Sequence, residues 1–238
     1  MITQKGITSE SHISFQNDEN LSNTFREPIK IGLSEELDQC KIPKNILWKF
    51  LPTKKEGEKE YTLVLDMDET LIHYPENPIE EHDQDWYNLR PGLHKFLETM
   101  SKYFEIIIFT AGTQDYADYI LDQVDFQKRI SHRLYRQHTT QVGEVFTKDL
   151  GRLGRDLSKM VIVDNLSENF EKQKRNGIKI KSWYDNLEDT VLSDLSIILE
   201  EIVMRKPNDI RLQLEKQRDV LNKYTAKGES LPRVSIIL

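Results

Sequence analysis

Two aspartates, one residue apart, follow directly after a short apolar run. Residues 61–74 read Tyr-Thr-Leu-Val-Leu-Asp-Met-Asp-Glu-Thr-Leu-Ile-His-Tyr, so Asp66 and Asp68 stand where a buried strand would leave its sheet. Side chains alternate along an extended chain, and both carboxylates therefore face the same side. Neighbouring carboxylates that lose solvation are unfavourable unless a metal ion or acid–base chemistry uses them. The stretch predicts a catalytic or metal site, with a strand that ends in a capped turn as the plain structural alternative.

These residue types suit phosphoryl transfer. Mg²⁺ prefers hard oxygen ligands, and Asp66 can give it one oxygen while the other attacks phosphorus, which would form an aspartyl phosphate. Asp68 can protonate the leaving oxygen and later activate water. Thr70, two residues further on, can donate a hydroxyl hydrogen bond that orients the pair.

Three later segments carry polar residues that suit the same chemistry. Thr110 follows an isoleucine-rich run and precedes Ala111, where a hydroxyl and free backbone N–H groups can hold a phosphate. Lys148 can neutralise phosphate charge, and Asp164 and Asn165 offer oxygen atoms to a metal. Taken singly, these residues have ordinary explanations: an N-cap, a surface lysine and a turn. Their order along the chain indicates more than any one of them.

Strands and helices alternate from residue 61 onward. Apolar runs predict strands at 61–65, 104–109, 160–163 and 178–183. Helical spacing or composition predicts helices at 92–103, 114–124, 190–204 and 207–224. The alternation predicts a Rossmann-like three-layer α/β sandwich with a central, mostly parallel sheet, and the gaps between motifs are too short for a large cap domain. Because ligands bind beyond the carboxyl ends of such strands, Asp66, Thr110 and Asp164 are expected to converge in one crevice.

Composition bounds the class of protein. The 238 residues are 37% hydrophobic and 31% charged with a net charge of −7, which suits a globular domain and argues against direct nucleic-acid binding. A single cysteine, Cys40, excludes an internal disulfide framework. No apolar run has the length of a membrane span, and the N-terminal residues lack the apolar core of a signal peptide. We expect an intracellular protein, nuclear or cytoplasmic, with a mitochondrial location also open.

The chain divides into four predicted parts. They are a flexible N-terminal arm over 1–40, a packing segment and linker over 41–58, a catalytic domain over 59–204, and a C-terminal helical extension with an apolar tail over 205–238. The regions 1–58 and 205–238 are the expected contacts if the chain assembles into a larger protein complex.

The motifs together resemble those of the haloacid dehalogenase superfamily. Within it, they are similar to the phosphatases of the RNA polymerase II C-terminal domain, the NLI-interacting-factor-like family. The resemblance covers about residues 59–204. It rests on these segments: 65–73, Arg90-Pro91-Gly92, 109–111 with 116–118, 135–138, 148–157, 163–165 and 182–186.

The resemblance implies a role for each candidate residue. Asp66 would be the nucleophile and a Mg²⁺ ligand. Asp68 would be the general acid and base and would bind the metal through its backbone carbonyl. The remaining implied roles are phosphoryl contacts from Thr110, Ala111 and Lys148, and metal contacts from Asn165, directly or through water, with Asp164 in support.

The resemblance also implies a Mg²⁺-dependent serine/threonine phosphatase that acts on a phosphorylated protein segment. Two features depart from the family pattern. The segment between Thr70 and Pro91 is shorter than the usual three-stranded insertion, and it carries an acidic patch. The patch comprises Glu76, Glu80, Glu81, Asp83 and Asp85. After Asp164-Asn165 the chain continues Leu166-Ser167-Glu168, where the family usually has Ser-Pro.

Two interpretations stay open at this stage. The basic residues between 128 and 138 either attract a phosphorylated segment or form a solvated basic helix face. The whole chain either catalyses, or keeps the phosphatase fold as a non-catalytic scaffold subunit of a larger complex, for example a mitochondrial one.

Overall fold

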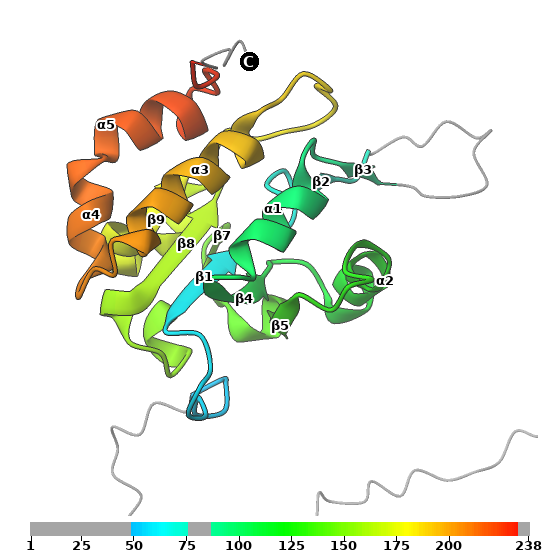
Figure 1. Cartoon of the computed structure of the whole chain (residues 1–238). Helices are drawn as coiled ribbons and strands as arrows, with labels where there is room; N and C mark the ends of the chain where they lie inside the picture. Colours follow the sequence, from blue (N-terminus) through cyan, green and yellow to red (C-terminus); the bar gives the residue numbers. More distant parts are fainter. Residues whose placement is uncertain (1–48, 76–86, 233–238) are drawn as a thin grey trace, which may run out of the picture. The chain divides into compact units, whose positions relative to one another are not determined.

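The computed structural model describes residues 49–75 and 87–232 (Figure 1). At its centre is a five-stranded sheet in the order β5-β4-β1-β8-β9, and every neighbouring pair is parallel. The strands are β1 (Tyr61–Leu65), β4 (Phe104–Phe109), β5 (Ile130–Leu134), β8 (Met160–Asp164) and β9 (Gly177–Lys179). The predicted α/β class with a mostly parallel sheet is confirmed.

Helices and two small hairpins surround this sheet. The α-helices are α1 (Leu93–Met100), α2 (Gln114–Val124), α3 (Val191–Met204), α4 (Ile210–Lys216) and α5 (Arg218–Leu221), and a π-helical turn, η5 (Asn222–Ala226), follows. The hairpins pair β2 (Ile72–His73) with β3 (Asn88–Leu89) and β6 (Thr140–Val142) with β7 (Val145–Thr147). Across the described ranges these inserts form no separate cap domain, and no helix is long and apolar enough to cross a membrane.

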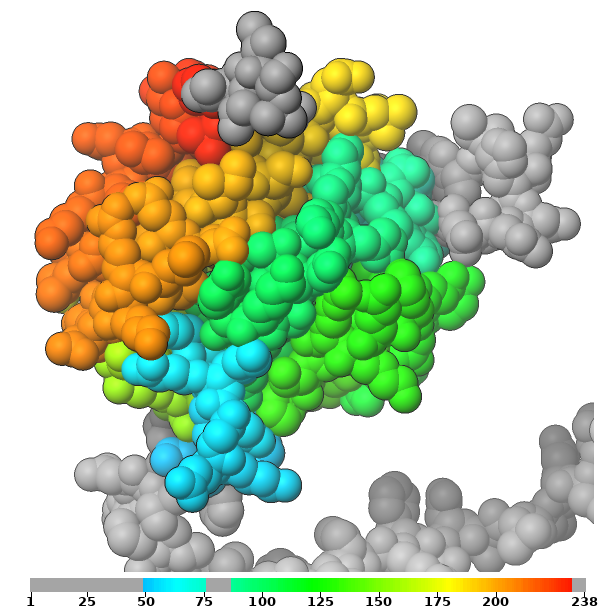
Figure 2. All heavy atoms as spheres, viewed as in Figure 1, coloured from blue at the N-terminus to red at the C-terminus, as the bar shows by residue number. Residues whose placement is uncertain are grey.

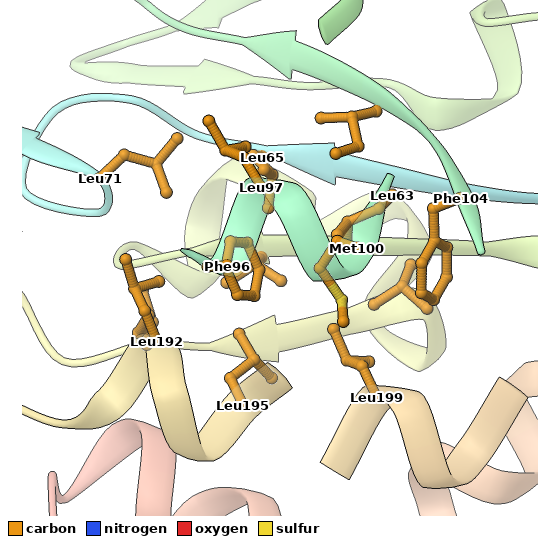
Figure 3. Close-up of a cluster of buried hydrophobic side chains, with 14 of the residues drawn as sticks. Leu63, Leu65, Leu71, Phe96, Leu97, Met100, Phe104, Leu192, Leu195 and Leu199 are labelled. Carbon is orange, nitrogen blue, oxygen red and sulfur yellow. The ribbon is translucent and has the colours of Figure 1, made fainter. Parts of the chain in front are cut away.

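The α-helices bury their apolar stripes against one face of the sheet. Leu63 and Leu65 alternate with Val64 along β1, so the two leucines face the helices and Val64 faces the other side. Figure 3 shows Phe96 and Leu97 of α1 and Leu195 of α3 gathered beside these leucines. Full burial of one such side chain contributes about 1.5–3 kcal/mol, so this face contributes substantially to stability.

The other face is covered by short 3₁₀ segments and by the chain before β1. Their bounds are η1 (Arg136–His138), η2 (Leu150–Arg152), η3 (Leu157–Lys159) and η4 (Ser167–Asn176). Phe170 of η4 and Leu51 pack against Val64 and Phe109 there. The described part of the predicted packing segment, residues 49–58, therefore contributes Leu51 to the core. The predicted arm at 1–40, residues 41–48, the acidic patch and residues 233–238 lie outside the described residues.

Residues 205–232 pack onto the sheet and helices (Figure 2). Ile210, Leu214 and Leu221 are buried in the same core as α1 and α3. The Thr225 hydroxyl donates to the carbonyl of Lys179 over 2.8 Å. The Lys181 N–H donates to the carbonyl of Thr225 over 2.8 Å. The C-terminal segment therefore satisfies backbone groups beyond β9 that the sheet leaves unpaired.

Four predicted elements differ from the structure. The helix predicted over 92–103 covers only Leu93–Met100, because the N–H groups of Lys102 and Tyr103 bond to carbonyls three residues back and form a turn. The last strand ends at Lys179 rather than at 183. The Ile180 N–H still donates to the carbonyl of Asp164 at the end of β8, but the N–H groups of Lys181 and Trp183 donate to the carbonyls of Thr225 and Glu69 instead. The helix predicted over 207–224 breaks near Gln217 and continues as α5 and η5. The alternative prediction of a solvated basic helix face between 128 and 138 is wrong, because residues 130–134 form the edge strand β5.

Candidate active site

A buried lysine joins two strand ends at the carboxyl edge of the sheet. The ammonium of Lys148, just after β7, lies 2.5 Å from Oδ1 of Asp66 and 2.6 Å from Oδ2 of Asp164. Burial by itself would lower the pKa of Lys148, but the charges of the two aspartates outweigh it and raise this pKa. Lys148 has no exposed surface, so its alternative interpretation as a surface lysine is wrong.

Asp66 has a hydrogen-bond partner at each carboxylate oxygen. The Thr70 hydroxyl donates to Oδ2 over 2.9 Å, and Lys148 occupies Oδ1. The Asp66 N–H continues the sheet by donating to the carbonyl of Val163 over 3.0 Å. β1 and its neighbour β8 therefore fix the backbone that carries this carboxylate, and the Thr70 hydroxyl holds the side chain of Asp66, though not that of Asp68.

Asp68 has a different set of partners. The Tyr116 hydroxyl donates to Oδ1 over 2.5 Å, and the Thr110 hydroxyl donates to Oδ2 over 3.2 Å. Burial raises the pKa of Asp68 to about 6; the hydrogen bond from Tyr116 opposes this rise, and the charge of Asp66 adds to it. A carboxyl group with such a pKa holds a proton near neutral pH more readily than an ordinary aspartate, which suits a proton donor.

The turn after Asp68 is held by two long-range contacts. Glu69 adopts a left-handed backbone conformation with φ of 54°, which is costly for a residue with a side chain. The Trp183 N–H donates to the carbonyl of Glu69 over 2.8 Å. The buried guanidinium of Arg90 donates to the carbonyl of Thr70 over 3.1 Å and makes two bonds to the carboxylate of Asp189. These contacts fix the loop of Glu69 and Thr70, which directly follows Asp68.

The segment after β4 forms a small cradle. The Gly112 N–H donates to the Thr110 hydroxyl over 2.9 Å. A Cβ at Gly112 would lie 3.0 Å from the Tyr116 ring and 3.2 Å from the Thr110 oxygen, so glycine keeps this space open. The N–H of Ala111 has no hydrogen-bond acceptor among the residues that the structure describes, which leaves it available to an anion.

Asp164 is enclosed by donors. Its Oδ1 accepts from the Leu166 N–H over 2.8 Å and from the Asn169 amide over 3.0 Å, and its Oδ2 accepts from Lys148. Burial and the charge of Asp66 raise the pKa of Asp164 to about 6, although Lys148 acts in the opposite direction. These contacts make Asp164 chiefly the anchor of Lys148. The Asn165 amide donates to the Ser182 hydroxyl over 3.0 Å, which leaves its carbonyl oxygen for another partner.

The donor set fits a magnesium ion. Lys148 pairs with the carboxylates of Asp66 and Asp164, and Asp68 accepts from the hydroxyls of Thr110 and Tyr116, so one ammonium faces two carboxylates with a third nearby in sequence, and a divalent cation would balance the remaining negative charge. All the candidate donors are hard oxygen atoms. In the described ranges no three acidic, histidine or cysteine side chains gather as a ready metal cluster. Amide and backbone oxygens and water would therefore complete the shell, as is usual for Mg²⁺.

The basic stretch at 128–138 is divided among separate partners. Arg133 bonds to Asp118 and Asp122, and His132 lies 3.4 Å from Glu105. Only Arg136 lies beside the cradle, where its Nε donates to the carbonyl of Ala111 over 2.6 Å and its guanidinium lies over the Phe146 ring. The stretch is not one phosphate-attracting surface.

Sequence reasoning did not assign roles to three residues that hold the site together. Tyr116 bonds to Asp68, Arg90 clamps the loop after β1, and Asn169 anchors Asp164. Tyr116 and Arg90 stand inside recognised motifs, so a signal existed for both. Asn169 lies in a polar segment with no apolar pattern, and only the fold brings it to the site.

The arrangement defines a class of protein. A parallel α/β sheet with paired aspartates after its first strand, and with a threonine, a lysine and an aspartate at neighbouring positions, is the haloacid dehalogenase-like architecture. The chain belongs to the NLI interacting factor-like phosphatase family, whose sequence profile matches residues 61–211.

Comparisons with individual proteins agree with this family. The chain is 44% identical over 165 residues to CTD small phosphatase-like protein 3 of Caenorhabditis elegans, covering 64% of this chain and 58% of that protein. It is 32% identical over 175 residues to human carboxy-terminal domain RNA polymerase II polypeptide A small phosphatase 1, covering 68% of this chain and 67% of that protein. The chain thus spans less than two thirds of the worm protein's length. A solved structure of Fcp1, an RNA polymerase II CTD phosphatase, is similar with a TM-score of 0.42 and 24% identity, covering 73% of this chain and 55% of that one.

Proposed function

We propose that this chain is a Mg²⁺-dependent protein serine/threonine phosphatase that acts through an aspartyl phosphate on Asp66. One observation carries the proposal: the two aspartates of the pair have different partners. Asp66 faces the ammonium of Lys148, whereas Asp68 accepts from the hydroxyls of Tyr116 and Thr110. Two carboxyl groups in unlike surroundings can take unlike roles, one as nucleophile and one as proton carrier.

In the first step, a carboxylate oxygen of Asp66 attacks phosphorus and the bond from phosphorus to the serine or threonine oxygen breaks. Asp68 gives its proton to that leaving oxygen. Lys148 and the free N–H of Ala111 hold the phosphoryl oxygens as the charge shifts. Mg²⁺, held by Asp66, Asn165 and the backbone carbonyl of Asp68 with Asp164 in support, would neutralise charge on the phosphoryl group when bound.

In the second step, water attacks the phosphorus of the aspartyl phosphate. Asp68, which is now a carboxylate, takes a proton from this water and returns to its starting state. The bond between phosphorus and the Asp66 oxygen breaks, which releases phosphate and restores the nucleophile. Thr70 and Lys148 keep the Asp66 carboxylate oriented through both steps.

The proposed substrates are phosphorylated protein segments. Over the described residues the carboxyl edge of the sheet carries short hairpins rather than a cap domain, which suits an extended peptide better than a small metabolite. The named relatives are C-terminal-domain phosphatases. Serine or threonine as the phosphorylated residue is the part of this proposal that rests on the motif resemblance alone. An intracellular site of action, nuclear or cytoplasmic, is part of the same proposal.

Hydrolysis of an aryl phosphate tests this proposal. Wild type should turn over with Mg²⁺ and lose activity in EDTA, and Asp66→Asn should lose at least about 10²-fold in kcat, because the attacking oxygen is gone. Asp115→Asn is the matched control, since Asp115 is exposed on α2 and has no role in the site. Wild type that binds Mg²⁺ but never turns over would favour the scaffold interpretation instead.

A further inference from the structure

A cavity separate from the candidate active site lies between the family domain and the C-terminal extension. It has a volume of about 500 Å³ and is bordered by η4 and β9 on one side and by α4, α5 and η5 on the other. None of the active-site residues described above lines it. The side chains that matter for its chemistry are Phe170, Lys174, Arg175, Lys179, Glu215 and Arg218. We call this cavity the C-terminal groove.

The groove depends on the extension and on one glycine. Glu215, Arg218 and Asn222 form its outer wall, and all three lie beyond residue 211, where the match to the family profile ends. On the opposite wall the buried Phe170 ring packs against Gly177, where an added Cβ would approach the ring to 2.0 Å. The groove therefore forms where residues of the family domain meet residues beyond 211.

The groove has an excess of positive charge. Two of its cations are paired with glutamates in the same walls: Lys174 with Glu171, and Arg175 with Glu215 at 3.1 Å. Among the residues that the structure describes, Lys179 and Arg218 have no glutamate or aspartate partner of this kind. Arg218 uses Nη1 to donate to the carbonyl of Gly177 over 2.7 Å.

Lys179 is the groove cation with the fewest partners among the described residues. It is exposed, and within the described part of the chain its ammonium makes no hydrogen bond or ion pair. Hydrogen bonds lower the pKa of Glu168, and the charge of Lys179 lowers it further by a smaller amount. Among the described residues, Glu168 forms no ion pair with Lys179. In a chain with a net charge of −7, a concave site with two uncompensated cations attracts anionic groups selectively.

The groove begins close to the proposed active site. Ser167 is one of its lining residues and stands two residues after Asn165. Two residues of extended chain span at most about 7 Å. The backbone of Ser167 in the groove therefore lies within about 7 Å of the backbone of Asn165, the proposed metal ligand. A peptide whose phosphorylated residue reacts at Asp66 can continue into the groove within a few residues.

We propose that the C-terminal groove binds an acidic segment of the same phosphoprotein substrate that reacts at Asp66. The inference rests on the proposed function and adds a substrate class to it: proteins with carboxylate or further phosphate groups a few residues from the phosphorylated site. The ammonium of Lys179 and the guanidinium of Arg218 suit such groups. Nucleic acid fits less well, because two uncompensated cations cannot track a polyanion and the rest of the chain is acidic.

Peptide binding to full chains that carry Asp66→Asn tests the groove without hydrolysis. The probes are two labelled peptides with one phosphoserine, followed after about three to six residues by a run either of glutamates or of glutamines. The glutamate peptide should bind about tenfold more tightly at low salt, and Lys179→Glu should remove that preference. Lys55→Glu is the matched control, because Lys55 is also exposed but lies outside the groove.

The outcomes separate this proposal from the proposed function. An unchanged glutamate preference in Lys179→Glu, or an equal loss in Lys55→Glu, overturns the groove proposal. Binding to anionic lipid vesicles is measured with the same chains. If Lys179→Glu loses vesicle binding but keeps its peptide binding unchanged, the groove proposal is overturned too, in favour of a membrane surface. If Lys179→Glu removes the preference but wild type never hydrolyses an aryl phosphate, the groove stands and the proposed function fails. With Asp66 intact, Lys179→Glu should keep kcat/KM for the aryl phosphate within about twofold of wild type, and a larger loss contradicts a separate groove.

Discussion

The hydroxyl of Tyr116 on α2 lies 2.5 Å from Oδ1 of Asp68, the second aspartate of the pair after β1. The two residues are 48 positions apart in the sequence, and only the packing of α2 beside the carboxyl edge of the sheet brings them together. Together with the Thr110 hydroxyl on the other oxygen, Tyr116 fixes the direction of the Asp68 carboxyl group. A proton donor that points correctly before the substrate arrives does not have to be ordered during the reaction.

Tyr116→Phe should therefore slow catalysis without unfolding the chain. The change removes one hydrogen bond and keeps the ring, so we expect kcat for an aryl phosphate to fall about tenfold with KM nearly unchanged. Steady-state kinetics and a thermal melt measure both effects. Tyr119→Phe is the control, because Tyr119 is exposed on the same helix. Equal kcat values for Tyr116→Phe and wild type would show that Asp68 needs no such support.

The C-terminal extension should be required for stability. Leu214 of α4 is fully buried in the main core, whereas Leu212 on the same helix is 48% exposed. Leu214→Ala should lower the free energy of unfolding by about 2–5 kcal/mol, because it removes buried apolar surface and leaves a cavity. Leu212→Ala should change it by less than about 1 kcal/mol. Urea denaturation measures both values, and similar small effects would mean that residues 205–232 are an appendage.

A buried carboxylate at the opposite edge of the sheet should make stability depend on pH. Burial alone would raise the pKa of Glu105, but hydrogen bonds from Arg155 and the charge of Lys54 lower it to about 2 from an ordinary value of 4.5. The Arg155 guanidinium donates to both oxygens, over 2.8 and 2.6 Å. Because the folded pKa is the lower one, the ionised form stabilises the fold above pH 4.5, and this contribution is lost as the pH falls toward 2.

The size of this effect can be measured against Glu105→Gln. From pH 7 to pH 3, the stability difference between wild type and Glu105→Gln should shrink by about 2 kcal/mol. Urea denaturation at the two pH values gives this difference directly. A difference that stays constant between the two pH values would mean that Glu105 titrates normally in the folded chain.

The sequence predicts the parts of the fold whose signals are local. The strands 61–65 and 104–109 and the helix 114–124 have clear apolar patterns, and their predicted bounds agree with β1, β4 and α2. The convergence of Asp66, Thr110 and Asp164 follows from the rule that parallel strands present their carboxyl ends at one edge. This placement follows from the position of each residue at the end of its strand.

The remaining features depend on long-range contacts. β5 has polar residues, such as Arg133 and His132, that pair with acids on α2 and β4, so no apolar run marks the strand. Glu69 takes a conformation that normally favours glycine, because Trp183 and Arg90 hold the loop around it. The C-terminal groove exists only where the extension meets η4. None of these leaves a periodic signal in one segment of sequence.

The most direct measurement of the central claim is the trapping of the phosphorylated enzyme. Wild type is mixed with Mg²⁺ and an excess of aryl phosphate, quenched in acid within one turnover, digested and analysed by mass spectrometry. The proposed mechanism predicts a phosphoryl group on the peptide that contains Asp66, its absence from Asp66→Asn, and its absence when EDTA replaces Mg²⁺. Turnover by wild type with no phosphoryl group on that peptide, or with the group on another residue, would contradict the role of Asp66 as the nucleophile.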